Sequence, residues 1–274
     1  MARSETSQRG QTSDEVVGIL KKKLNFSAWP LTERELIAGF SPQEQQTGVL
    51  ADYRLEREIL LTSMTSCVTR RYSYRKIDSP LALALTVIVG QAGARDAAEE
   101  LVAMIAASQM RREPRVDFQG IGDVVVYPQP TSDQSIAFVR KNIAINIEGY
   151  ARFDQKLPIR ELAQQIDGQL KQRETSEDLA DQERTPKILR FEPETSSVKA
   201  GGRTDLVIDL QDNYPPHELL FEALNGSYNR DPAEPDLWYF RAGHQRGSAQ
   251  VILTVVNSIN LLAKASARIE IGST

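Results

Sequence analysis

Residues 80–108, PLALALTVIVGQAGARDAAEELVAMIAAS, indicate the fold class of the middle of the chain. The apolar run 81–89 ends in β-branched residues and is too short to cross a membrane, so it predicts a buried strand. A glycine-marked turn follows. In 94–108 the apolar side chains, among them Leu101 and Ile105, recur at helical spacing, and acidic residues occupy the N-terminal part. The segment therefore predicts a strand, a turn and an amphipathic helix.

Similar patterns extend on both sides of this segment. Residues 67–74 alternate like a strand, and 123–127 are rich in valine. Residues 135–150 predict one long strand, or two strands joined at 141–142. Residues 157–172 predict a second helix, with a proline near its first turn. This order predicts the α+β class, an antiparallel sheet with helices packed on one face.

The N-terminal arm, residues 1–50, has too little apolar surface for a core of its own. Residues 1–14 form a polar tail, and 15–25 predict a short helix. Thr32 and Glu35 fit a capping box for another helix. We expect this helical arm to pack on the rest of the chain or on a protein partner, and the candidate partner-binding residues are Val17, Leu20, Leu24, Trp29, Leu36 and Phe40.

A charged segment divides the chain. Residues 173–187 are almost wholly polar or charged, which is typical of a linker. Residues 188–274 then show short alternating segments between Gly, Pro and Asn turns, which predict an Ig-like β-sandwich of about six or seven strands. The predicted organisation is an arm over 1–50, an α+β domain over 51–172, the linker, and the sandwich.

Composition excludes several classes of site. Lys and Arg number 33 against 37 Asp and Glu, a formal net charge of −4, so the chain does not have the excess of basic residues typical of nucleic-acid binding. Cys67 is the single cysteine and His217 and His244 are the two histidines, which excludes a disulfide within the chain and a cysteine-rich metal site. We therefore expect no metal, no cofactor and no transmembrane segment.

No sequence motif indicates catalysis. G-x-S-x-G and H-E-x-x-H are both absent. The turn 90–94, GQAGA, has the strand-to-helix context of an anion site but lacks a lysine. We expect no catalytic residue and a protein that is not an enzyme.

A basic cluster and an aromatic stretch each leave two interpretations open. Arg70, Arg71 and Arg75 with Lys76 predict a polar sheet face or edge, and anion binding is the alternative. In the stretch 238–240, Trp238 and Phe240 point one way along a strand and Tyr239 points the other. The aromatic side chains belong to the sandwich core or, alternatively, form a sugar-binding platform of Tyr214, Tyr228, Trp238 and Tyr239.

Two blocks resemble known families. The stretches SSVKAGGRTDLVIDL, DLWYFRAG and GSAQVILTVVNSINLLAKASARIEI resemble bacterial Ig-like and cadherin-like surface modules. The stretches RDAAEELVAMIAAS, GIGDVVVY, SIAFVRKNIAINI and LPIRELAQQIDGQL resemble sensor-type and lipoprotein domains of the bacterial cell envelope, although the paired cysteines of some such domains are missing. The resemblance implies an extracytoplasmic, non-enzymatic protein that binds a ligand or partner.

The leading functional interpretation is a binding or assembly module of the bacterial cell envelope that acts through protein–protein contacts. The arm is its expected partner-binding segment. An alternative is a carbohydrate-binding accessory protein that uses the sandwich aromatics, and a lower one is a hydrolase whose site is assembled from distant residues. The location is extracytoplasmic, in the periplasm or at the cell surface, if a signal was removed, and otherwise cytoplasmic, because the N-terminus is polar. The oligomeric state stays open.

Overall fold

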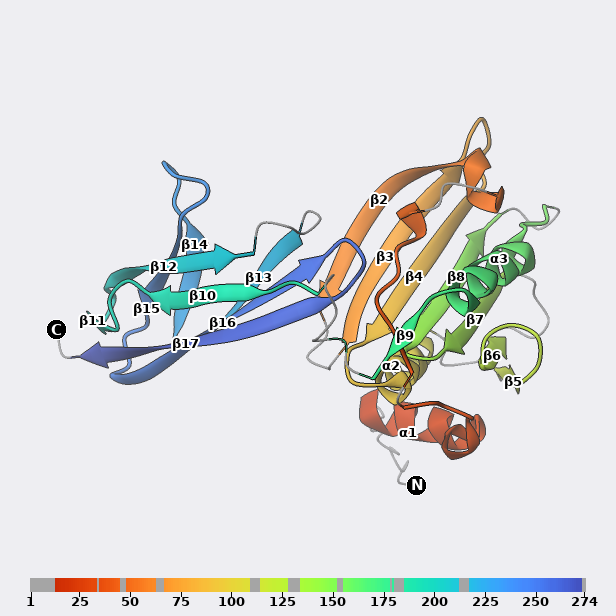
Figure 1. Ribbon diagram of the computed structural model, residues 1–274, viewed down its shortest axis with the longest axis horizontal. Coiled ribbons are helices and arrows are strands. Elements are labelled where there is room, and N and C mark those ends of the chain that lie inside the picture. The colour runs from red at the N-terminus through yellow and green to blue at the C-terminus, as the bar shows by residue number, and fades with distance from the viewer. Residues whose placement is uncertain are drawn as a thin grey trace, which may run out of the picture. The chain divides into compact units, whose positions relative to one another are not determined.

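The structure, a computed structural model, describes residues 13–33, 35–44, 48–62, 67–108, 114–127, 134–151, 155–177, 179, 185–211 and 217–272. The chain divides into two compact units, Met1–Glu177 and Asp178–Thr274 (Figure 1). The division falls within the charged segment 173–187. None of the described helices is long and apolar enough to span a bilayer.

The first unit contains an antiparallel sheet, as expected. Among the described residues, seven strands pair in the order β2-β3-β4-β8-β7-β6-β5. The elements are β2 (Tyr53–Thr62), β3 (Cys67–Lys76), β4 (Ala82–Gly90), α2 (Ala94–Ser108), β5 (Arg115–Asp117), β6 (Val124–Tyr127), β7 (Ser135–Arg140), β8 (Ile143–Tyr150) and α3 (Ile159–Lys171). The stretch 135–150 therefore forms two strands, and the turn between them places Lys141 at a φ of 52°.

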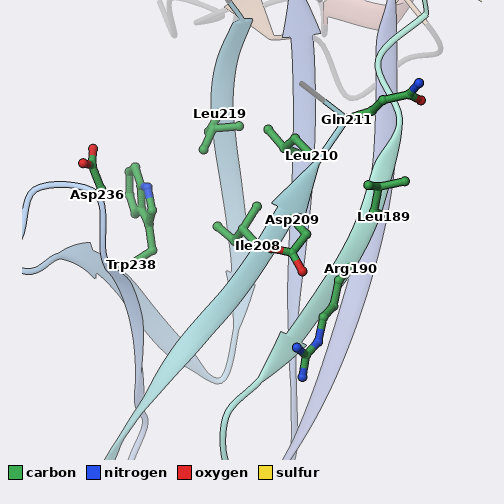
Figure 2. Close-up of a pocket in the computed structure, with 9 residues that line it drawn as sticks. All are labelled: Leu189, Arg190, Ile208, Asp209, Leu210, Gln211, Leu219, Asp236 and Trp238. Carbon is green, nitrogen blue, oxygen red and sulfur yellow. The ribbon is translucent and has the colours of Figure 1, made fainter. Parts of the chain in front are cut away.

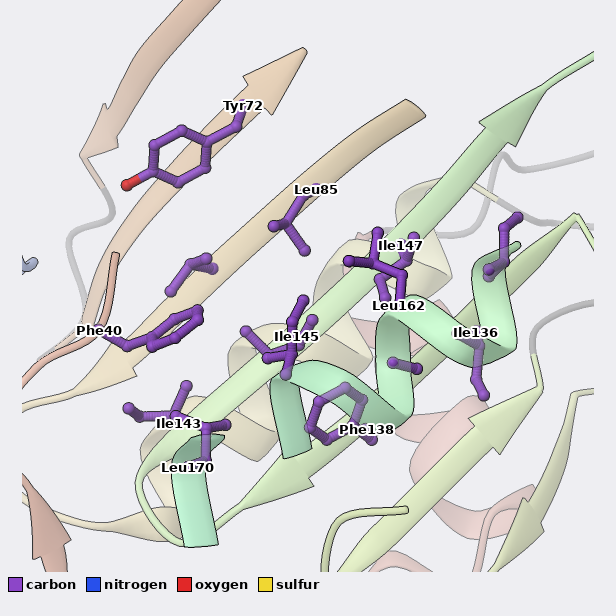
Figure 3. Packing of buried hydrophobic residues seen from close by; sticks show 14 of the residues in the cluster. Phe40, Tyr72, Leu85, Ile136, Phe138, Ile143, Ile145, Ile147, Leu162 and Leu170 are labelled. Atoms are coloured by element: carbon purple, nitrogen blue, oxygen red, sulfur yellow. The ribbon is translucent and has the colours of Figure 1, made fainter. Parts of the chain in front are cut away.

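Helices cover both faces of this sheet, so the expectation of helices on one face is wrong. One hydrophobic cluster joins α3 to Ile143, Ile145 and Ile147 of β8 (Figure 3). A second cluster joins α2 to the opposite face through Ala144 of the same strand. The physical reason is in the strand itself, because 143–147 is apolar at nearly every position and all five residues are buried. A strand that is apolar on both sides needs a cover on both sides.

The N-terminal arm begins with α1 (Ser13–Lys23) and includes the short helical turns η1 (Phe26–Ala28), η2 (Pro42–Glu44) and η3 (Gly48–Asp52). The helix expected from Thr32 onward does not form. Leu36–Ile37 is instead a short strand, β1, that pairs with β9 (Thr175–Ser176).

Asn142 explains why this part of the arm is extended. The backbone N–H of Ile37 donates to Oδ1 of Asn142 at 2.6 Å, and Nδ2 of Asn142 donates to the carbonyl oxygens of Ile37 at 3.3 Å and of Gly90 at 2.9 Å. Asn142 and Ile37 are both fully buried. The N–H of Ile37 is thus satisfied by a distant side chain rather than by a helical turn, and its carbonyl oxygen also accepts from the N–H of Gly39 at 2.7 Å.

The second unit consists of two four-stranded sheets in the residues described. One sheet has the order β10-β12-β15-β14 and the other β11-β17-β16-β13. Their bounds are β10 (Ile188–Pro193), β11 (Ser197–Lys199), β12 (Arg203–Leu210), β13 (His217–Leu224), β14 (Gly226–Arg230), β15 (Trp238–Ala242), β16 (Gly247–Asn257) and β17 (Leu262–Gly272). Both sheets contribute to one hydrophobic cluster, so the unit is a sandwich, and the described residues form eight strands where about six or seven were expected.

Candidate functional site

An open groove in the second unit has a volume of about 960 Å³. Its walls come from β10, β12, β13 and the segment that leads into β15 (Figure 2). The apolar lining residues are Leu189, Ile208, Leu210, Leu219 and Trp238, and the polar ones are Arg190, Asp209, Gln211 and Asp236. The groove therefore combines an apolar wall with a polar rim.

A β-bulge shapes the β10 side of the groove. Ile188 pairs with Leu210 and Arg190 pairs with Asp209, so Leu189 is an extra residue between two neighbouring pairs. Such a residue is left out of the ladder and its side chain is re-aimed. Leu189 is accordingly 67% exposed, although it is an apolar residue within β10, the edge strand of its sheet. The bulge places both Leu189 and Arg190 at the groove.

Trp238 belongs to the core and to the groove at the same time. Its ring centroid lies 4.3 Å from that of the buried Phe221 and 6.2 Å from that of Tyr228. The guanidinium carbon of Arg230 lies 4.7 Å from the indole centroid, which is cation–π geometry. Figure 2 shows the indole nitrogen on the side of the ring that faces Leu219 across the groove. The half-buried indole thus offers its edge and its N–H to a ligand.

The structure brings together only part of the aromatic platform expected from the sequence. Trp238 and Tyr228 lie near each other, as the 6.2 Å separation of their rings shows. Tyr239 points to the opposite face of the same sheet, where the guanidinium carbon of Arg203 lies 4.0 Å from its ring centroid. Strand alternation requires this separation of neighbouring side chains. Tyr214 lies outside the described residues.

Arg190, Asp209 and Asp236 are the charged residues that line the groove. The Arg190 guanidinium donates from Nε to Oε1 of Glu192 at 2.8 Å, and this hydrogen bond is the main cause of the raised pKa of Arg190. Asp209 and Asp236 are exposed and form no ion pair with any described residue. They remain hydrogen-bond acceptors at the rim, beside the amide of Gln211.

The six candidate partner-binding residues of the arm pack on their own unit. Leu24 and Trp29 are buried in the cluster under α2, and Val17 and Leu20 pack against it. Phe40 is buried in the cluster on the α3 face, and Leu36 is buried as well. Of the two expectations for the arm, packing on the rest of the chain is the one observed. The four buried side chains do not present a surface to a partner in this conformation.

The described residues support neither a metal site nor the anion site considered at the turn 90–94. In the part of the chain that the structure describes, no three His, Cys, Asp or Glu side chains are grouped so that they could hold a metal ion. At the turn 90–94, the space beside Gly93 is taken by Glu33, whose Oε2 would lie 2.5 Å from a Cβ at that position. A carboxylate already stands where an anion would bind at this helix N-terminus.

Comparison with known proteins gives a match among solved structures alone. No family model matches it, and no curated protein matches it. Among solved structures it is similar to a SusE-like surface-located polysaccharide-binding protein from the Bacteroides thetaiotaomicron heparin utilisation locus, at 10% identity and a TM-score of 0.22. The match covers 81% of this chain and 36% of that protein's chain, so this chain spans little more than a third of its length.

Proposed function

We propose that this protein binds a saccharide in the groove of its second unit, with Trp238 as the central contact. The observation that carries the proposal is the composition of the groove, in which an indole edge and aliphatic side chains face carboxylate and amide groups. A sugar ring has an apolar face of C–H groups and a periphery of hydroxyl groups. Aromatic and aliphatic side chains bind the first, and carboxylates and amides bind the second.

The size and openness of the groove fit this ligand class. Its volume of about 960 Å³ lies near the upper end of the usual range for small-molecule sites, ~300–1,000 Å³. The groove is open to solvent, as binding of a sugar unit within a longer chain requires. An oligosaccharide or polysaccharide is therefore a better match than an isolated small metabolite.

The proposal is binding without turnover. Glycoside hydrolysis needs one carboxyl group that stays protonated near neutral pH, and apolar burial is the usual way to achieve this. Asp209 and Asp236 are both exposed, and among the described residues that line the groove there is no histidine, cysteine, serine or lysine. The proposed role is thus that of a carbohydrate-binding accessory protein, and an extracytoplasmic location belongs to the same proposal.

The test is a glycan array followed by titration calorimetry with the full chain. We expect Trp238→Ala to weaken binding of the best glycan at least about tenfold, as the loss of a central aromatic anchor does. Tyr239→Ala is the matched control, because this neighbouring aromatic residue lies on the other face of the sheet. Circular dichroism checks that both variants are folded. Unchanged binding by Trp238→Ala, or an array without any bound glycan, would contradict the proposal.

A further inference from the structure

Four arginines of β2 and β3 share one face of the seven-stranded sheet in the first unit. Arg54 lies directly opposite Arg75, and Arg57 lies opposite Ser73. Arg71, Ser73 and Arg75 are alternate residues of β3, so their side chains point to the same side. All four arginines reach the surface, and the side-chain exposures of Arg54, Arg75 and Arg71 are 75%, 48% and 39%. We call Arg54, Arg57, Arg71 and Arg75 the arginine face.

The arginine face lies on the side of the sheet that α2 covers only in part. Ile88 and Ala144 on this side belong to the hydrophobic cluster under α2. Ala82, Ala84 and Thr86 also lie on this side, as the cross-strand partners of Arg75, Ser73 and Arg71, and none of these three belongs to that cluster. Ala84 and Thr86 are nevertheless buried, at 4% and 3% exposure, and the arginine side chains on either side of them reach the surface.

Only part of the positive charge is neutralised by neighbours. Glu56 accepts a hydrogen bond from Nε of Arg75 at 2.6 Å and lies 3.7 Å from Nη2 of Arg54. Glu148 accepts from Nη2 of Arg71 at 3.1 Å. Glu56 thus lies between Arg54 and Arg75, and Glu148 pairs with Arg71.

Arg57 forms no ion pair with any other residue that the structure describes. The four arginines thus exceed the two glutamates by two positive charges, on a chain whose formal net charge is −4. This local positive charge is opposite in sign to the net charge of the protein. It arises because β2 pairs with β3. The sequence cluster at residues 70–76 shows only half of it, because Arg70 points to the other face and is buried.

An aromatic ring completes the surface. Tyr150 of β8 pairs with Ala82 of β4, and Ala82 pairs in turn with Arg75 of β3. Tyr150 is 51% exposed. Its hydroxyl donates to Oε2 of Glu148 at 2.8 Å and accepts from Nη2 of Arg71 at 3.0 Å. Partial burial and the bond to Glu148 raise the pKa of Tyr150, so the ring stays neutral. A neutral exposed ring beside arginines can contact the face of a sugar.

We infer that the arginine face binds an acidic polysaccharide, a chain whose sugars carry carboxylate or sulfate groups. Guanidinium groups bind such groups through paired hydrogen bonds, and a linear chain can meet several of them in succession. Single-stranded nucleic acid is a poorer match, because its binding sites use several aromatic rings for stacking and this face exposes Tyr150 alone among the described aromatic residues. The inference concerns the first unit and does not depend on the groove at Trp238.

The test measures binding of heparin oligosaccharides and polygalacturonate fragments to the full chain, at low and at physiological salt. We expect binding that weakens with salt and that falls about tenfold in the double variant Arg57→Gln/Arg75→Gln, as the loss of two charge-assisted contacts predicts. Arg115→Gln is the matched control, because Arg115 is also exposed, at 64%, on strand β5 at the opposite edge of the same sheet. Binding of neutral dextran should be the same for the wild type and the double variant.

Three results would overturn the inference. The first is the absence of acidic polysaccharide binding at low salt. The second is equal binding of acidic polysaccharide by the wild type and the double variant. Loss of this binding in Trp238→Ala counts the same way, because it would assign the acidic ligand to the groove of the second unit. The third is tighter binding of an oligothymidylate or of phosphatidylserine vesicles than of any acidic polysaccharide. A neutral glycan that still binds at Trp238 in these experiments would leave the proposed function intact.

Discussion

The two units bury their strands in different ways. In the first unit, consecutive residues of β8 are buried because α2 and α3 cover opposite faces. In one sheet of the second unit, no residue of β10 is buried, and β12 buries only Thr204 and Leu206. In this sheet of the sandwich, residues such as Trp238 therefore serve both packing and the groove, whereas β16 of the other sheet buries residues 253–257 in succession. The first unit separates these tasks, since its arginine face lies apart from its cores.

The largest expected effect tests this difference in packing. Phe138 of β7 is fully buried in the cluster on the α3 face (Figure 3). Phe138→Ala should lower the free energy of unfolding of the first unit by about 3–5 kcal/mol, because it removes contacts and leaves a cavity. Leu189→Ala in the exposed bulge of the second unit should change stability by less than ~0.5 kcal/mol.

The two tryptophans make the comparison measurable unit by unit. Trp29 lies in the first unit and Trp238 in the second. In a Trp238→Phe background, fluorescence during urea unfolding follows the first unit, and in a Trp29→Phe background it follows the second. A comparable loss of stability in Phe138→Ala and Leu189→Ala would show that the two units do not differ in packing as described.

A smaller effect is expected where the arm joins the first unit. Asn142→Ala removes the side-chain partner of the buried Ile37 N–H, whereas the Ile37 carbonyl oxygen still accepts from the N–H of Gly39 at 2.7 Å. We expect a loss of about 1–3 kcal/mol, the cost of unsatisfied buried polar groups. Limited proteolysis should then cut between α1 and β2 faster than in the wild type. Asn146→Ala is the control, since Asn146 is buried but bonds to Glu148 at the surface, and faster cleavage in that variant too would show that Asn142 has no special role in holding the arm.

The smallest expected effect is a change in the pKa of Asp231, a carboxyl group of the second unit. The backbone N–H of Ala233 and the Arg203 guanidinium lower the pKa of Asp231, in that order of size. A lowered pKa in the folded state means that the interaction is present above the ordinary pKa of the carboxyl group and is lost as the pH falls through the lowered value. Arg203→Gln should raise the pKa of Asp231 in an NMR titration without restoring its ordinary value, because the Ala233 bond remains. No change in pKa would mean that Arg203 does not contact Asp231 in solution.

Local patterns were reliable where the chain obeys one period. The strand 81–89, the helix 94–108 and the helix from 157 onward all occur close to their expected positions. The opposite directions of Trp238 and Tyr239 also follow from strand alternation alone. Strand β2 was missed because its charged residues give no apolar alternation, and a helix was expected at 32–40 because Leu36, Ile37 and Phe40 have helical spacing.

The sequence by itself determined the strands and helices with regular patterns, the charged division between the units and the face on which each strand residue lies. Tertiary structure decided the surfaces. Pairing of β2 beside β3 joined Arg54 and Arg57 to Arg71 and Arg75, and a bulge at Leu189 shaped the groove. The physical reason is that spacing along one strand sets only the direction of a side chain. Its neighbours are set by register with distant strands and by which faces the helices leave uncovered.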